Sequence, residues 1–440
     1  MNYLLAILFV LPFLSCAILG ILMWIKRYQS EIFYSRITVL VFVFNIVAFA
    51  LLLGANLLSD VWSSFHFLSD NMREQKSWPF AIALDIYSGI LVIFYCLLIG
   101  LIAVFSRRYL HRDPGYFRFY FFLNLFGAGV QTILIASSLG LLIVGWELVG
   151  VASAMLISFF YERNKPVEHG LRAFFTYRVC DVGFVIALLL LHTTHSSAWF
   201  NLDSNPAMQT LGLPPGSGLV FAVGLALVWA AAGKSAQLPF SGWLPRAMEG
   251  PTPSSAIFYG AISVHLGAFL LLRCAALIEE SAILKAVIIV IAFITAIHST
   301  LIGRVQTDIK SLLAYASLTQ VSVIWIEIAL GFYALAVLHM IGHGAVRSLQ
   351  ILKSPSALHD HQHLEEALGS QIPAKAKHLE TLVPKSLHYW LYRQSLDRGF
   401  AEAIIRNGLF LPVTNVLGWF EKLDQQWIGF INKTSKRVEG

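Results

Sequence analysis

Charged side chains are scarce in this sequence. Asp, Glu, Lys and Arg make up 13% of its 440 residues, whereas soluble domains carry about 25%. This composition excludes an ordinary soluble domain for most of the chain. Cysteine is scarce too. The four cysteines all fall inside apolar runs, where they indicate small buried side chains and not a disulfide framework or a metal site.

Motifs of soluble enzymes are also missing. The sequence contains no Gly-rich phosphate loop, no cofactor motif and no nucleophile–base set, which disfavours a stand-alone enzyme. The net charge of +6 does not indicate a nucleic-acid partner, because the basic residues of a membrane protein gather in its cytoplasmic loops.

Long apolar runs dominate the chain, of which 57% is hydrophobic. About eleven runs are long enough to cross roughly 30 Å of hydrocarbon as helices. They cover residues 3–25, 37–58, 82–105, 117–137, 139–160, 170–193, 218–240, 254–275, 282–303, 311–330 and 332–353. The first run lacks a basic start and is followed by Lys26 and Arg27, so we interpret it as an uncleaved span. The sequence therefore predicts an all-α, polytopic membrane protein.

Lysine and arginine alternate between the connecting loops. The loops of one side carry Lys26, Arg27, Arg36, Arg107, Arg108, Arg112, Arg118, Arg163, Lys165, Arg172, Arg246, Arg304 and Lys310. The loops of the other side carry Arg73, Lys76 and Lys285, with Arg273 near one edge. Because the richer side faces the cytoplasm, we expect the N-terminus outside and the C-terminus in the cytoplasm.

The composition changes after the last run, which divides the chain into a transmembrane domain, 1–353, and a cytoplasmic or interfacial tail, 354–440. Ser354 as an N-cap, Pro355 and Gly369 predict a short polar helix. Amphipathic helices are expected over residues 385–407 and 413–431, and they suit either the membrane surface or the docking of a partner protein. In the polar helix, "HDHQH" (His359, Asp360, His361, His363) could bind a metal, but no further ligand is identifiable.

Two charged residues lie inside apolar runs, Glu147 in "GWELVG" and Lys234 in "AAGKSAQLPF". A charge at the bilayer centre costs at least about 2.5–3.5 kcal/mol, so such residues normally face a partner or water. Lys234 precedes Pro239 and Pro245. Proline breaks helices, and broken helices at membrane depth line ion sites in transporters. We therefore expect the seventh helix to be discontinuous near Lys234.

Other ionisable residues share these runs. Arg178 and Asp181 are three residues apart and can pair along one helix face. His265 lies in the eighth run, and Asp308 and Lys310 lie at a polar break. His339, His343 and Arg347 follow each other at intervals of four residues, so they form one polar stripe. Carboxylates, amines and imidazoles suit a proton relay, while static ion pairs or hydrogen bonds to helix carbonyls are the alternative.

Five segments carry a family resemblance, and together they extend over roughly residues 80–353. They are "WELVGVASAMLISFFYER", "RVCDVGFVIALLL", "GKSAQLPFSGWLPRAMEGPTPSSA", "LIGRVQTDIKSLLAYASLTQ" and "LHMIGHGAVRSLQ". These segments resemble the antiporter-like proton-translocating subunits, which include the L-type subunit of respiratory complex I and the large Mrp antiporter subunits. The resemblance implies that Glu147 and Lys234 are a coupled pair in a proton path. The motif positions also include His339, His343, Arg178, Asp181, Asp308 and Lys310.

The sequence departs from that family pattern in three places. Tyr259 stands where the family often has a histidine, and His265 follows six residues later. Arg347 replaces a lysine and cannot readily give up its proton. The family's second broken helix should follow the eleventh run, but here the sequence turns polar, so the path needs another exit or a partner.

With "RSLQILKSPSALHD" after the histidine run, the chain looks most like the small membrane subunit of Dab-type inorganic-carbon uptake systems. That resemblance implies the bacterial inner membrane and a large, zinc-dependent, carbonic-anhydrase-like partner on the cytoplasmic side. Proton flow through this subunit would drive CO₂ or bicarbonate uptake. No cofactor is expected in this chain, and the zinc is expected in the partner. The alternatives are a proton-pumping subunit of a complex I-like or hydrogenase complex, and a subunit of a cation/proton antiporter.

Overall fold

The computed structural model describes residues 2–25, 30–59, 64–66, 81–194, 211, 213–214, 216–368, 384–396, 407–408 and 411–438. Two compact units divide the chain, Met1–Ala376 and Lys377–Gly440. Within the described ranges, ten helices are long and apolar enough to cross a membrane, and Gly218–Lys234 is a shorter apolar helix. This confirms the predicted all-α, polytopic fold.

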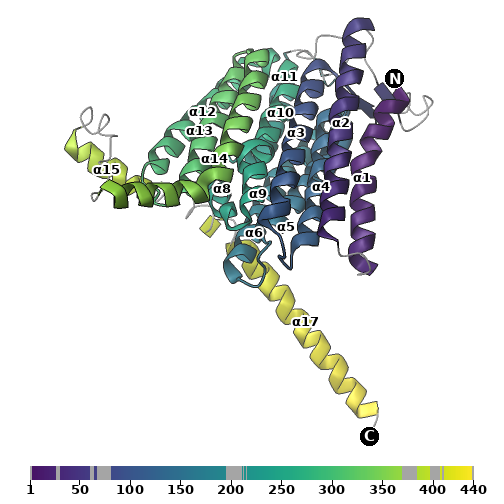
Figure 1. Ribbon diagram of the computed structural model, residues 1–440, viewed down its shortest axis with the longest axis vertical. Coiled ribbons are helices and arrows are strands. Elements are labelled where there is room, and N and C mark those ends of the chain that lie inside the picture. The colour runs from purple at the N-terminus through teal and green to yellow at the C-terminus, as the bar shows by residue number, and fades with distance from the viewer. Residues whose placement is uncertain are drawn as a thin grey trace. The chain divides into compact units, whose positions relative to one another are not determined.

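The first unit is a bundle of helices lying side by side, with α1 and α2 at one edge and α12–α14 at the other (Figure 1). Its first half contains α1 (Asn2–Ile25), α2 (Glu31–Ser59), α3 (Ile86–Tyr109), α4 (Tyr116–Ile135), α5 (Leu139–Ile157) and α6 (Asn164–Thr193). Between α2 and α3, a short antiparallel pair, β1 (Ser64–His66) and β2 (Ala81–Ala83), places Ser64 opposite Ala83.

The second half of the bundle is interrupted twice. It contains α7 (Gly218–Lys234), η3 (Phe240–Gly242), α8 (Trp243–Arg246), η4 (Ala247–Glu249), α9 (Thr252–Ser255), η5 (Ala256–Ala261) and α10 (Ser263–Arg273). There follow α11 (Ala275–Glu280), α12 (Ala282–Gly303), α13 (Ile309–Ala329) and α14 (Tyr333–Leu368). Broken backbone is tolerated at membrane depth only where protein or water satisfies its polar groups, and the first break meets that condition.

Protein groups satisfy the backbone at the break after Lys234. The amide of Gln237 donates to the carbonyl of Ala232 at 2.9 Å, and the amide of Leu238 donates to the Thr295 hydroxyl of α12 at 3.0 Å. Ala236 is buried, and its backbone adopts the left-handed conformation with φ 51°, which is unfavourable for residues that have a Cβ atom. The chain thus turns sharply out of α7 directly after Lys234, as the prolines predict.

The second break lies in the eighth span, where the sequence predicts one continuous helix. Residues Ala256–Ala261 form a π-helical stretch, in which the amide of Ile262 donates to the carbonyl of Ile257 at 2.8 Å. Gly260 permits close packing there, since a Cβ at this position would lie 3.0 Å from the backbone nitrogen of Ser348 in α14. The stretch immediately precedes α10, which carries His265.

Helix α14 continues past the point where the sequence predicts a new helix. Ser354 does not cap a separate helix, because the helical backbone runs through Pro355 to Leu368. Pro355 has no amide hydrogen to donate to the carbonyl of Ile351, and the Ser354 hydroxyl donates to that carbonyl at 2.8 Å instead. The helix therefore keeps this carbonyl satisfied across the proline.

The second unit contains two described helices, α15 (Lys385–Leu396) and α17 (Leu411–Val438). On α17, Val416, Phe420 and Trp427 recur at helical spacing and are exposed. The side chains of His359, His361 and His363 lie outside the described residues. Among the side chains that are described, no group of three or more His, Cys, Asp or Glu could hold a metal ion.

Candidate functional site

Lys234 ends α7 and is buried, with 1% of its surface exposed. Its Nζ faces the rings of Tyr177 at 4.2 Å and Trp146 at 5.4 Å, as measured to the ring centroids. Nζ has no hydrogen-bond partner among the described residues. A cation against aromatic faces is stabilised, but it keeps its hydrogen-bonding capacity for another group. A buried amine in this position is suited to exchange a proton.

Two acids near this lysine, Glu147 and Asp181, share one arginine as their ion-pair partner. Arg178 of α6 forms ion pairs with Glu147 of α5 and, at 2.9 Å, with Asp181. The indole nitrogen of Trp146 donates to the other carboxylate oxygen of Asp181 at 2.7 Å. Among the described residues, Lys234 makes no ion pair with Glu147. The resemblance implies that these two residues are a coupled pair, and in the structure Arg178 is the cation in direct contact with Glu147.

These four groups balance each other electrostatically. With Glu147 and Asp181 ionised and Arg178 and Lys234 protonated, the cluster carries no net charge. Asp181 and Glu147 both interact electrostatically with Lys234. Gly150 allows the approach, because a Cβ at this position would meet Lys234 Nζ at 3.1 Å and Arg178 Nη2 at 3.3 Å. A proton gained or lost by one member changes the field at every other member.

A second chain of polar groups runs from α3 to α14. The Tyr95 hydroxyl lies 3.3 Å from His265 Nδ1, and His265 Nε2 lies 2.8 Å from His343 Nδ1. The rings of His343 and His339 are 6.5 Å apart. His339 contacts Glu327 of α13 at 2.9 Å through Nδ1 and Gln320 at 3.0 Å through Nε2. Arg347 lies one turn beyond His343, and its Nε has no partner among the described residues.

The two clusters meet where α7 ends. The Ser235 hydroxyl, next to Lys234, donates to the carbonyl of Val264, next to His265, at 2.7 Å. Gly267 permits this approach, since a Cβ there would lie 2.3 Å from Ser235 Oγ. The charged cluster of α5–α7 and the histidine chain of α10–α14 therefore flank one contact between α7 and α10.

The remaining predicted residues lie elsewhere. Asp308 is exposed and caps α13, accepting a hydrogen bond from the amide of Ser311 at 2.7 Å, and Lys310 lies in the first turn of that helix. Pro239 precedes η3, and Pro245 lies in α8. The structure gives Asp308 a capping role and, within the described ranges, no ion pair.

Three residues of the histidine chain were not among the predicted site residues: Tyr95, Gln320 and Glu327. Tyr95 and Gln320 are uncharged, and they look like ordinary span residues. Glu327 is a charge inside an apolar run, which is a signal in itself, but its partner His339 is not identifiable from spacing alone.

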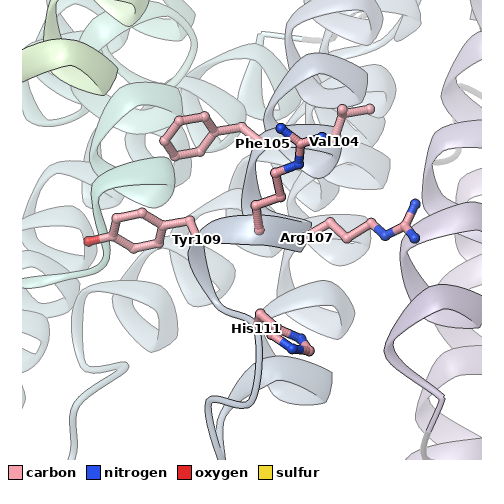
Figure 2. A pocket seen from close by; sticks show the side chains of 6 residues that line it. Val104, Phe105, Arg107, Tyr109 and His111 are labelled. Atoms are coloured by element: carbon pink, nitrogen blue, oxygen red, sulfur yellow. The ribbon is translucent and has the colours of Figure 1, made fainter.

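A cavity of about 940 Å³ lies apart from both clusters, at the end of α3. It is lined by Val104, Phe105, Arg107, Arg108, Tyr109 and His111. Figure 2 shows Arg107 and Tyr109 pointing to opposite sides of this helix end. The cavity shares no residue with the two clusters, so it is not part of the candidate site.

Comparison with protein families gives a match over residues 136–384 to the family described as "NADH:quinone oxidoreductase/Mrp antiporter, TM". The chain is 33% identical over 263 residues to NADH-quinone oxidoreductase subunit L of Mycobacterium tuberculosis, covering 59% of this chain and 41% of that protein. It is 32% identical over 265 residues to the probable inorganic carbon transporter subunit DabB1 of Halothiobacillus neapolitanus, covering 59% of this chain and 46% of that protein.

A solved structure shows the same fold. The chain superposes on a chain of the Mrp complex from Dietzia sp. DQ12-45-1b with a TM-score of 0.66 and 21% identity, covering 79% of this chain and 37% of that one. The chain spans less than half the length of the two curated relatives above.

Proposed function

Because the chain belongs to the NADH:quinone oxidoreductase/Mrp antiporter family of transmembrane subunits, we propose that it carries protons through the bilayer along the two clusters. One observation carries the proposal. Lys234 is a buried amine at the broken end of a membrane helix, without a hydrogen-bond partner among the described residues and beside two carboxylates held by Arg178. A static structural lysine would be expected to have direct partners.

The contacts suit a transfer of protons by hopping. With a hydrogen on His343 Nδ1, that nitrogen donates to His265 Nε2, and His265 Nδ1 then donates to the Tyr95 hydroxyl. A proton that arrives at His343 Nε2 lets the hydrogen on Nδ1 move to His265 Nε2. This transfer moves one proton from His343 Nδ1 to His265 Nε2, along the one hydrogen bond that joins the two rings.

In our proposal, this proton flow drives the uptake of inorganic carbon. The Dab-type resemblance and the carbon-transporter relative support this reading. The partner would be a large carbonic-anhydrase-like protein on the cytoplasmic side, and it would hold zinc. The hydration chemistry would take place in that partner, and the chain itself would act as the transport subunit.

Co-expression tests this function. We expect the chain and the carbonic-anhydrase-like protein together, and neither alone, to support growth of a carbonic-anhydrase-deficient cell in air. An uncoupler should stop carbon accumulation. Purification of the chain with quinone- or hydrogenase-type redox subunits would instead identify a respiratory subunit. Cation-dependent proton exchange in membrane vesicles without carbon uptake would identify an antiporter subunit.

A further inference from the structure

Glu327 lies at the end of the histidine chain, on α13, and faces α14. Its Oε1 is 2.9 Å from His339 Nδ1, and the two side chains are 15% and 20% exposed. Its other oxygen, Oε2, is buried and has no hydrogen-bond partner among the described residues. Glu327 lies in the last turn of α13, where a buried carboxylate is costly unless it is paired or hydrogen-bonded, and His339 is the one group in direct ionic contact with it among the described residues.

Two hydrogen-bond contacts hold the ring of His339. Both ring nitrogens face oxygen atoms, Nδ1 the carboxylate of Glu327 and Nε2 the amide oxygen of Gln320 at 3.0 Å. These oxygens accept hydrogen bonds and cannot donate them while Glu327 is ionised. A neutral imidazole has a single N–H, whereas an imidazolium has two. In this arrangement, His339 makes both bonds only as an imidazolium.

We propose that Glu327 holds His339 as a resident imidazolium, so that the pair stores one proton for the histidine chain. On release, the proton leaves His339 Nε2 and enters His343 Nε2, which is buried and has no partner among the described residues. The N–H bond at His339 breaks and the N–H bond at His343 forms. The amide of Gln320 then turns over, so that its NH₂ donates to the exposed lone pair of Nε2.

The charges around the pair are consistent with storage. On α14 the nearest cationic side chain is Arg347, beyond His343, and α10 contributes His265 to His343. Glu327 is the carboxylate that contacts His339, and release of the proton takes the Glu327–His339 pair from neutral to a charge of −1. The store therefore refills readily, because the ionised carboxylate attracts the next proton back to His339.

Nitrogen NMR of the full chain in bilayers, with ¹⁵N-labelled histidine, tests the proposal directly. The parent should show an imidazolium signal that disappears in the His339→Gln variant, which assigns it. The Glu327→Gln variant, which is isosteric, should lose the same signal, and Glu327→Asp should restore it. Glu279→Gln is the matched control, since Glu279 lies between two spans and pairs with Lys285 at 3.0 Å. An imidazolium signal that persists in Glu327→Gln contradicts the proposal.

Proton flux into membrane vesicles tests the role of the pair in transport, which rests on the proposed function. We expect Glu327→Gln to slow flux by about 10²-fold, a typical contribution of a proton-transfer group, and Glu327→Asp to recover much of it. Normal flux in Glu327→Gln despite a lost imidazolium signal would overturn the storage role and leave the proposed function standing. Absence of flux in the parent would overturn the proposed function, while the NMR measurement would still decide the charge of His339.

Discussion

A buried ion pair, Asp85–Arg273, joins the helices that carry the first two members of the histidine chain. The two side chains are 6% and 4% exposed. Asp85 caps α3 by accepting from the amide of Ser88 at 2.9 Å, and Arg273 also donates to the carbonyl of Leu134 at 2.8 Å. Replacing Asp85 with Asn keeps a good N-cap but removes the carboxylate charge that pairs with the buried guanidinium.

The expected loss of stability follows from this burial. Removing one partner of a buried pair costs about 3–5 kcal/mol. The retained cap and the bond to Leu134 favour the lower end, about 3 kcal/mol, which is roughly a hundredfold in the unfolding equilibrium. Unfolding of the purified full chain by denaturant in detergent micelles measures it. Asp113→Asn is the matched control, because the Asp113 side chain accepts from the amide of Gly115 at 2.7 Å, and Asn keeps that acceptor.

The same substitution also tests the site. Tyr95 lies about 15 Å along α3 from Asp85, and His265 lies about 12 Å along α10 from Arg273. The two helices run antiparallel, so the ion pair fixes their spacing at the end nearest this contact. We expect Asp85→Asn to slow proton flux as well. An Asp85→Asn chain as stable as the Asp113→Asn chain would refute the assigned contribution of the pair.

Three further outcomes are expected. Lys234→Ala should abolish ion-dependent activity while the chain stays in the membrane. Adding Glu147→Gln should lower the activity little further, since the effects of residues that act as a unit are non-additive. Additive losses in a flux assay would show that the two residues act independently. Gly150→Ala should slow proton flux and lower the stability by about 1–3 kcal/mol, because the added methyl group would crowd Lys234 Nζ. Unchanged flux would show that this contact does not affect Lys234. A hydrogen bond from Lys285 and one from Tyr333 lower the pKa of Glu279 below its usual 4.5, so its contribution to stability is present above that value and lost as pH falls through the lowered pKa. Acid unfolding of Glu279→Gln should lack this component.

The spans of this protein could be predicted from the sequence because membrane helices are recognisable by their length and hydrophobicity. The interruption after Lys234 was predictable for a similar reason, since proline has a fixed effect on the backbone wherever it occurs. The π-helical stretch of the eighth span has no such marker. It depends on the packing of Gly260 against Ser348, which are far apart in the sequence.

The composition of the histidine chain was only half predictable. A charged residue in an apolar run reveals a cost, and so Glu147, Lys234 and the α14 stripe were visible. Its position in the sequence does not reveal which group pairs with the charge. Tyr95 and His265 are 170 positions apart, and only the packing of α3 against the α10 segment makes them neighbours. For Glu147 the resemblance implies a lysine partner, whereas the direct contact is with Arg178.

Arg178 forms ion pairs with two acids at once, Glu147 and Asp181. When either Glu147 or Asp181 becomes neutral, the guanidinium keeps its ionic contact with the other carboxylate. No intermediate has to strand an arginine in the bilayer, where an isolated cation is at its most expensive. A change of protonation state then breaks one ion pair of Arg178 and leaves the other in place. Under the proposed function, either of the two acids can therefore take up a proton first while Arg178 stays paired with the other.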